Sequence, residues 1–467
     1  MTRDPAPLTP TSAADSAAWV APDDLLLLVD RYELSMVEAQ LEEGLLEPAV
    51  FSLFTRRLPE SRNYLLACGL DTVLGCLESL RATPATLEYL EDAGFGPRLI
   101  EWLRDFRFTG DVRAVPEGTP IFRNEPILEI EAPFPQAQLV ETIVMNQMHL
   151  QSVLASKASR VRQAAGARRV IDFGLRRMHG ADAGLKGARA YHIAGLDGTS
   201  NELAGRRWGV PVTGTMAHAW IQAHDDELEA FRSFVATHPA TVLLVDTFDT
   251  LEGVRNVVRL AGELGDDFRV RGIRLDSGDL ATLARASREI LDDAGLAAVE
   301  IFASGGLDEW KIRELIRADA PIDGFGVGTA MGVSADAPSL DLVYKLVARA
   351  GSVRMKLSSE KTTLPGRKQV FRRVEGGEAV GDVIGRAAER GIGRPLLRPV
   401  MRGGERLAAG EESLETIRRR VRDELSILPP PLLDLDPADP PYPVEISPAL
   451  AHLRDEVRAE LEHQVRG

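Results

Sequence analysis

The spacing of hydrophobic and polar positions changes along the chain and divides it into three parts. Residues 22–150 mix short extended runs, such as 49–54 and 126–131, with helical stretches, which predicts an N-terminal α+β domain. A long amphipathic helix is predicted from about residue 139 to 166, because Val140, Ile143, Val144 and Met148 fall on one helical face. After this helix, the spacing of the hydrophobic positions changes.

Short β-branched runs recur in the second part, residues 151–349. They predict strands at 170–173, 190–193, 211–213, 242–245, 270–275, 299–302 and 323–327. Helical segments separate several of these runs, for example at 250–264, 279–294 and 308–318. Such alternation is typical of parallel βαβ units. Seven or eight units favour a (β/α) barrel, and periodicity leaves a doubly wound open sheet as the alternative.

The two ends of the chain differ from this pattern. Residues 1–21 are rich in Ala, Pro, Ser, Thr and Asp and predict a disordered tail. After a last extended run at 342–346 the chain becomes basic, with Lys356, Lys361, Lys368 and Arg372. A proline-rich stretch at 428–448 and a charged helix to about residue 462 follow. We expect the segment 350–467 to pack back on the N-terminal domain.

Composition narrows the functional classes. Of 467 residues only Cys68 and Cys76 are cysteines, so a disulfide framework and a cysteine-based zinc site are excluded and a reducing compartment is favoured. The apolar run 25–29 is too short for a signal peptide or a membrane span, so we expect a cytoplasmic protein without membrane contact. The formal net charge of -15 opposes nucleic-acid binding, so an anionic ligand needs a local cationic pocket.

Candidate chemistry lies where the predicted barrel strands end, because functional residues of parallel barrels lie there. Residues 172–177 read Asp-Phe-Gly-Leu-Arg-Arg, in which Phe173 could stack on a flat ring while Arg176 pairs with a carboxylate or phosphate. The alternative is an aromatic core residue beside a surface ion pair. Residues 198–201, Gly-Thr-Ser-Asn, could present hydroxyl and backbone donors, although alone they indicate only a turn.

Two further strand exits carry ionisable side chains. Residues 213–218, Thr-Gly-Thr-Met-Ala-His, end on His218, whose ring nitrogen could attack phosphorus or carry a proton, although a lone histidine is more often structural. Residues 274–279 read Arg-Leu-Asp-Ser-Gly-Asp. Arg274 suits a phosphate, and Asp276 suits Mg2+ or ribose hydroxyls, whereas Asp279 fits a helix N-cap. The glycine-rich exits 303–306 and 324–329 favour a phosphorylated ligand.

Taken together, these segments resemble the nicotinate phosphoribosyltransferase family, from residues 30–36 to residues 442–447. The most specific pieces are 172–177, 214–218, 274–278 and 361–368, which keep the family's order and spacing. The resemblance implies an α/β fold: an irregular (β/α) barrel of the type II phosphoribosyltransferase kind, with an N-terminal α+β domain and a C-terminal extension. It also implies a homodimer whose active site is shared between subunits.

The resemblance further assigns roles to particular residues. Tyr32 would come from the partner chain, Phe173 would stack on the pyridine ring, and Arg176 would engage the substrate or its phosphates. His218 matches the histidine that family members phosphorylate from ATP, so a phosphohistidine is expected there. The residues expected near the ribose and phosphates are Arg274, Asp276, Thr215, Ser304, Gly305, Gly306, Gly326, Gly328 and Thr329.

One position is expected to select the acceptor. Nicotinamide-using relatives resemble Gly-Thr-Asp where this chain has Gly-Thr-Ser at 198–200. An aspartate would repel a carboxylate, whereas the Ser200 hydroxyl can donate to it, so the exchange favours nicotinate.

The resemblance therefore implies an ATP-dependent enzyme of NAD synthesis. It would join nicotinate to phosphoribosyl pyrophosphate, with Mg2+ held through Asp276, and release nicotinate mononucleotide and pyrophosphate. Three alternatives stay open at this point: a phosphoribosyltransferase for nicotinamide or another pyridine, a barrel lyase or isomerase acting on a sugar phosphate with Asp276 as base, and a silent paralogue that senses the nucleotide.

Overall fold

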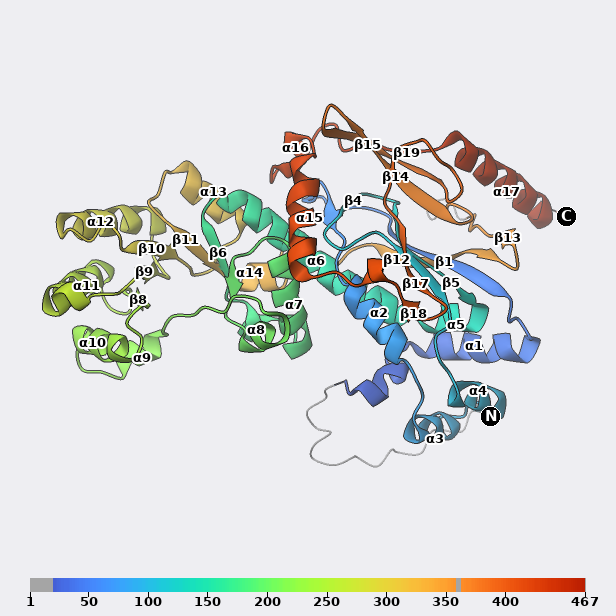
Figure 1. Cartoon of the computed structure of the whole chain (residues 1–467), viewed down its shortest axis with the longest axis horizontal. Coiled ribbons are helices and arrows are strands. Elements are labelled where there is room, and N and C mark those ends of the chain that lie inside the picture. Colours follow the sequence, from blue (N-terminus) through green and yellow to red (C-terminus); the bar gives the residue numbers. More distant parts are fainter. Residues whose placement is uncertain (1–19, 358–362, 467) are drawn as a thin grey trace.

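A computed structural model describes residues 20–357 and 363–466. Two large sheets lie towards opposite ends of the molecule, with helix α6 (Glu141–Ala165) between them (Figure 1). Residues 1–19 of the expected tail, and Lys361 of the basic stretch, lie outside the described residues. In the described part of the chain, no helix combines the length and the apolar character that crossing a membrane requires.

The first sheet is parallel and has the strand order β7-β6-β11-β10-β9-β8. Its strands are β6 (Arg169–Asp172), β7 (Gly198–Thr199), β8 (Val242–Leu244), β9 (Gly272–Leu275), β10 (Glu300–Ala303) and β11 (Gly324–Val327). The last strand, β11, pairs with the first, β6, as in a barrel and unlike a doubly wound sheet. A single bridge from Thr199 to Val212 extends the sheet beyond β7. The segment therefore forms a parallel half-barrel within a mixed α/β fold.

Helices cover the outer face of the half-barrel (Figure 1). They are α7 (Ala181–Ile193), α8 (Glu202–Trp208), α10 (Glu227–Thr237), α11 (Thr250–Leu264), α12 (Leu280–Asp293) and α13 (Glu309–Arg317). A side-chain oxygen accepts a first-turn N–H at the start of most of them, as expected for Asp279; these caps are Asn201, Asp226, Asp249, Asp279 and Asp308.

Two sequence expectations for this region need correction. Residues 190–193 were expected as a strand, yet they form the last turn of α7. The β-branched signal there is only four residues long, and the helical spacing of the buried Ala183, Gly187 and Tyr191 prevails over it. Residues 211–213 contribute one bridge to the sheet and no regular strand among the described residues.

The second sheet is antiparallel and has the order β13-β12-β1-β5-β3-β17-β18. Its strands come from distant parts of the chain: β1 (Pro48–Thr55), β3 (Asp111–Ala114), β5 (Pro126–Pro133), β12 (Leu342–Arg349), β13 (Ser352–Val353), β17 (Arg398–Arg402) and β18 (Glu405–Arg406). β12, which follows the half-barrel, pairs with β1, and β17 pairs with β3. The sheet is therefore completed only by residues that follow the half-barrel.

Smaller elements complete the fold. A four-stranded sheet is built from β14 (Lys368–Glu375), β15 (Glu378–Arg386), β16 (Arg394–Pro395) and β19 (Val444–Ile446), and β2 (Leu65–Leu66) pairs with β4 (Pro120–Ile121). The other helices are α1 (Arg31–Glu43), α2 (Leu70–Ser79), α3 (Pro84–Asp92), α4 (Pro97–Arg104), α5 (Phe134–Leu139), α9 (His218–Gln222), α14 (Thr329–Gly332), α15 (Leu414–Ser426), α16 (Pro430–Leu433) and α17 (Pro448–Arg466).

Helix α6 ties the two sheets together. It was expected at 139–166, and it packs against α7 and α13 on the half-barrel side and against α2 and β12 on the other. Buried ion pairs fix this contact: Lys157 Nζ donates to Asp336 and Glu309, and Arg160 donates to Glu309 at 3.1 Å. Because separating such buried charges is costly, α6 is held firmly against α13 of the half-barrel side.

Candidate active site

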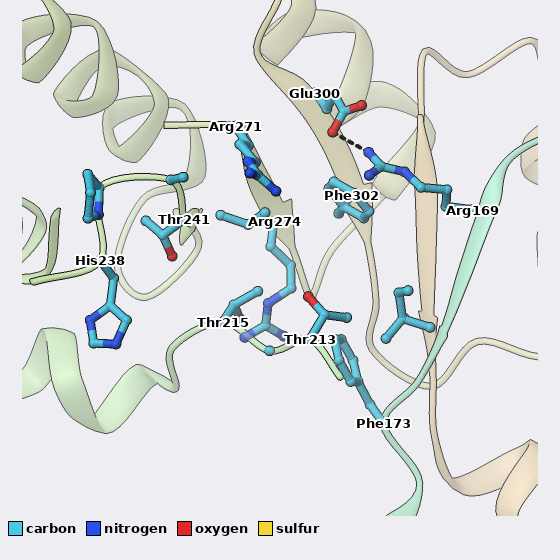
Figure 2. A pocket seen from close by; sticks show the side chains of 16 residues that line it. Arg169, Phe173, Thr213, Thr215, His238, Thr241, Arg271, Arg274, Glu300 and Phe302 are labelled. Carbon is cyan, nitrogen blue, oxygen red and sulfur yellow. Dashed lines mark hydrogen bonds and ion pairs between the residues drawn. The ribbon is translucent and has the colours of Figure 1, made fainter. Parts of the chain in front are cut away.

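A cavity of about 390 Å³ lies along the inner face of the half-barrel (Figure 2). Its lining includes Phe173, Thr213, Thr215 and Arg274, which gather where the parallel strands end. At the opposite ends of the strands, Arg169 forms an ion pair with Glu300. Phe173, Arg274, Thr215 and Gly326, all expected from the sequence, therefore share one cavity.

Glycines on β11 make room for this cavity. Side chains of a strand alternate between faces, and the positions of β11 that face inward are Gly324 and Gly326. A Cβ atom on Gly326 would lie 2.5 Å from Cε2 of Phe173, and one on Gly324 would lie 2.5 Å from Cε1 of Phe302. Ordinary barrels fill such interior positions with branched side chains. In this protein the two glycines, which have no side chain, leave the space that the rings of Phe173 and Phe302 occupy.

Arg274 donates hydrogen bonds to three residues in the polar part of the site. Its Nη1 donates to Asp276 Oδ1 at 2.9 Å and to Ser304 Oγ at 3.1 Å, and its Nη2 donates to the carbonyl oxygen of Met216 at 2.8 Å. Burial lowers the pKa of Arg274, with a contribution from the nearby positive charge of Arg176. The Nε–H of Arg274 is buried and has no hydrogen-bond partner among residues 20–357 and 363–466. A buried, incompletely paired guanidinium suits an anionic ligand.

Both the carboxylate and the backbone N–H of Asp276 form hydrogen bonds. Its Oδ1 accepts from Arg274 and from the Ser304 hydroxyl, and its backbone N–H donates to Asp246 Oδ2 at 2.9 Å. Gly305 packs so closely that a Cβ there would lie 1.7 Å from the Asp276 carbonyl oxygen. Gly305 also has a φ of +89°, which favours glycine. The structure therefore explains this glycine by close packing on Asp276.

His218 begins helix α9 and faces the same cluster. Its Nδ1 lies 3.1 Å from Thr247 Oγ1, and its Nε2 lies 4.0 Å from Asp276 Oδ2. The ring is partly exposed, with 42% of its side-chain surface accessible. An accessible Nε2 with a carboxylate nearby suits a nucleophile or a proton carrier.

Asp246 and Thr247 were not singled out from the sequence. They lie just beyond β8, separated from it by Val245, so the rule that functional residues follow barrel strands applies to them as well. Asp246 Oδ2 accepts from the Asp276 N–H and, at 2.7 Å, from Ser277 Oγ. Its Oδ1 is buried and has no partner in the described part of the chain. This carboxylate therefore fixes the loop after β9 and keeps one oxygen available.

The other expected residues follow neighbouring strands and are not among the residues that line the cavity. Ser200 follows β7, and its backbone N–H donates to the carbonyl oxygen of Asp172 at 2.9 Å. Arg176 is exposed on a short turn, and the adjacent Arg177 donates to Thr329 Oγ1 at 3.1 Å. Gly306 and Gly328 lie in the loops after β10 and β11.

Tyr32 lies apart from the half-barrel of its own chain. It lies on α1, at the far end of the molecule from β6–β11 (Figure 1), and is 50% exposed. Partial burial raises the pKa of its hydroxyl, and the nearby Glu141 and Glu33 add to that rise. One chain alone therefore does not bring Tyr32 to Phe173.

Two carboxylates decide whether this site could hold a divalent cation. Within residues 20–357 and 363–466, no group of three or more His, Cys, Asp and Glu side chains is arranged to hold a metal ion. Asp276 and Asp246 nevertheless supply two adjacent carboxylates, one with an unpartnered oxygen. Mg2+ is commonly bound by one or two carboxylates together with substrate phosphates and waters. These residues therefore fit a Mg2+ ion that arrives with a phosphorylated substrate.

Comparisons with known proteins identify the family. A model of the nicotinate phosphoribosyltransferase N-terminal domain matches residues 27–149, and the nicotinate phosphoribosyltransferase family model matches residues 168–357. The chain belongs to the nicotinate phosphoribosyltransferase family. The relationship predicted from the strand-exit motifs is thereby confirmed.

Individual family members are similar over most of the chain. Nicotinate phosphoribosyltransferase PncB2 of Mycobacterium tuberculosis is 51% identical over 439 residues, which cover 93% of this chain and 95% of that protein. The Bacillus subtilis nicotinate phosphoribosyltransferase is 43% identical over 359 residues, covering 75% and 73% respectively. The crystal structure of human nicotinic acid phosphoribosyltransferase superposes with a TM-score of 0.81 at 28% identity and covers 91% of this chain and 99% of its own.

Proposed function

We propose that this chain joins nicotinate to phosphoribosyl pyrophosphate, giving nicotinate mononucleotide and pyrophosphate for NAD synthesis. The observation that carries the proposal is a chain of contacts beside the cavity, in a protein 51% identical to a nicotinate phosphoribosyltransferase. Phe173 and Arg274 line the cavity, Arg274 pairs with Asp276, and Asp276 lies 4.0 Å from His218. A barrel lyase would need Asp276 as a free base, yet its Oδ1 already accepts from Arg274 and Ser304.

Each residue has a defined part in the transfer. The pyridine ring stacks on Phe173, and Ser200 donates to its carboxylate, which places the ring nitrogen against C1 of the ribose. The C1–oxygen bond to pyrophosphate breaks as the nitrogen–C1 bond forms. Arg274 and Arg176 neutralise the charge that develops on the departing pyrophosphate. A ring nitrogen carries no proton to remove, so no general base is required.

Asp276 and Asp246 would hold Mg2+ at the substrate phosphates. The ion supplies positive charge that screens the pyrophosphate oxygens. Arg274, which pairs with Asp276, holds this carboxylate in place. The loops at Gly305, Gly306, Gly328 and Thr329 are the candidates for the 5'-phosphate, because their backbone N–H groups are unencumbered by side chains.

ATP acts through His218. With Nδ1 donating to Thr247 Oγ1, the lone pair of Nε2 is free to attack the γ-phosphorus of ATP, forming an N–P bond while ADP leaves. The phosphohistidine adds nearly two negative charges beside Asp276 and Arg274. Such a charge changes the affinity of the site for pyrophosphate and couples ATP hydrolysis to the transfer.

We propose that two copies of the chain form a homodimer, in which Tyr32 of one copy completes the site of the other. The exposure of Tyr32 and its place on α1, far from the half-barrel of its own chain, support this proposal.

The proposed division is 22–150, 151–349 and 350–467, and the last strand of the middle segment, β12, joins the sheet of the N-terminal segment. The two cysteines are free, which supports a cytoplasmic location.

The test is product formation from phosphoribosyl pyrophosphate and Mg2+ with nicotinate or nicotinamide, each with and without ATP, followed by chromatography. We expect nicotinate-dependent product that rises with ATP. His218→Asn should abolish the rise with ATP and the appearance of acid-labile phosphate on the protein, and should leave slow basal synthesis. If product formed with nicotinamide and none formed with nicotinate, the role of Ser200 would be contradicted. If His218→Asn lost the basal and the ATP-stimulated rates equally, the role of His218 would be contradicted.

A further inference from the structure

A fully buried carboxylate lies directly behind the site and has no part in the chemistry described so far. Asp172 is the last residue of β6, and its side chain is 0% exposed. Its neighbours Ile171 and Phe173 line the cavity, whereas Asp172 is not among the lining residues. Burying a carboxylate is costly unless its oxygens are well paired. The partners of Asp172 therefore indicate why an acid stands there.

The two carboxylate oxygens serve two different loops. Oδ1 accepts the backbone N–H of Gly174 at 2.8 Å, which fixes the turn that follows Phe173. Oδ2 accepts from the hydroxyl of Thr199 at 2.7 Å, and Thr199 directly precedes Ser200. One side chain thus ties the loop of the stacking ring to the loop of the candidate carboxylate donor.

Further hydrogen bonds make this link rigid. The Phe173 N–H donates to the Val327 carbonyl oxygen at 2.8 Å, and the Ser200 N–H donates to the Asp172 carbonyl oxygen at 2.9 Å. Thr199 Oγ1 also accepts the Asn201 N–H at 3.1 Å, and Asn201 caps α8. An ionised carboxylate oxygen can only accept, so the Thr199 hydroxyl donates its hydrogen to Asp172 while its oxygen accepts from Asn201.

The chemistry of the position calls for an acid and not for an amide. Both partners of Asp172 are donors, so both side-chain oxygens must accept. An ionised carboxylate accepts at two oxygens, whereas an asparagine offers one oxygen and two further donors. Burial raises the pKa of Asp172, while Thr199 and the Gly174 N–H act in the opposite direction and stabilise the charged form.

We propose that Asp172 is a positioning residue that sets Phe173 and Ser200 at a fixed separation, so that a pyridine ring stacked on Phe173 presents its 3-carboxylate to Ser200. The inference rests on the proposed function and adds the basis of its acceptor specificity. Asp172 itself does not touch the substrate. It acts through the Gly174 turn on one side and through Thr199 on the other.

The link can be cut at Thr199 without touching either substrate-facing residue. Thr199→Val keeps the shape of the side chain and removes the hydroxyl, and Thr199→Ser, which keeps the hydroxyl, is the matched control. In Thr199→Val the KM for nicotinate should rise roughly tenfold, since a hydrogen bond to a charged group is lost. The kcat and the KM for phosphoribosyl pyrophosphate should change less than twofold, and the preference for nicotinate over nicotinamide should fall.

Asp172→Asn provides a second, independent cut. It should reproduce the Thr199→Val phenotype, and the double variant should be no worse than either single variant, because all three break the same link. Thermal unfolding of each variant identifies simple loss of fold, which would lower the active fraction without changing either KM.

The outcomes separate two failures. A wild-type protein that forms no product from nicotinate refutes the proposed function. A wild-type protein that uses nicotinate, while folded Thr199→Val and Asp172→Asn keep its KM and its preference for nicotinate within twofold, overturns the positioning role. Thr199→Ser behaving like Thr199→Val overturns it as well, because the control retains the hydroxyl.

Discussion

The substitution Gly326→Ala tests whether β11 seats the stacking ring or binds phosphate. The new Cβ would lie 2.5 Å from Cε2 and 2.6 Å from Cδ2 of Phe173, and 3.2 Å from Cβ of Ser304. Carbon atoms in ordinary contact are about 3.5 to 4.0 Å apart, so the ring must move by about 1 Å or more. A ring displaced by that distance no longer lies where the pyridine stacks.

The size of the effect follows from the two contacts that change. Overpacking a core position costs about 1–3 kcal/mol of stability. An aromatic stacking pair contributes about 0.5–1.5 kcal/mol beyond its buried area. Losing most of the stack therefore raises the KM for nicotinate about three- to tenfold, since about 1.4 kcal/mol corresponds to tenfold. The KM for phosphoribosyl pyrophosphate should stay within twofold.

The assay is steady-state synthesis with nicotinate varied at saturating phosphoribosyl pyrophosphate, followed by the reverse. Gly324→Ala is the matched control. Gly324 lies two residues earlier on β11, and its new Cβ would lie the same 2.5 Å from Cε1 of Phe302. It should lower the melting temperature similarly and leave the KM for nicotinate unchanged. A Gly326→Ala protein in which only the KM for phosphoribosyl pyrophosphate rises would refute the seating role and support the phosphate loop implied by the family resemblance.

Two further predictions concern stability. Gly305→Ala should destabilise the protein by more than about 2 kcal/mol and abolish activity, because its Cβ would lie 1.7 Å from the Asp276 carbonyl oxygen at a φ of +89°; a wild-type melting temperature would contradict this. Burial raises the pKa of Glu33 to about 7, so between pH 4.5 and 7 the native state binds more protons than the unfolded state and stability falls as pH rises. Glu33→Gln should remove that fall, so its melting temperature should gain on the wild type at pH 8 relative to pH 5; an equal difference at both pH values would contradict this.

The strand exits were the part of the site that sequence could predict. Parallel strands end at one edge, so His218, Arg274 and Asp276 could be expected together, and the structure brings them within contact of one another. Asp246 and Thr247 obey the same rule but carry no distinctive motif, and they were missed.

Other features depend on which side chains face one another in the folded chain and on pairings between distant segments. A local stretch of sequence does not encode either. Gly326 reads as part of a glycine-rich loop, and only the facing Phe173 ring reveals its close contact. The four residues 190–193 predict a strand, whereas Tyr191 lies in α7, because so short a window hides the helical spacing of the preceding residues. The pairing of β12 with β1 joins residues far apart in the chain, which no local pattern can indicate.

That pairing also sets an order for events during synthesis. Ala49 pairs with Arg349, about 300 residues later, and β3 waits about as long for β17. At about 5–20 residues per second, β1 leaves the ribosome about 15–60 s before its partner strand. The half-barrel lies wholly inside this interval, so all its strands emerge while the other sheet still lacks β12 and β17. The N-terminal strands therefore spend that time with unpaired edges, and shielding those edges falls to the helices around them or to a chaperone.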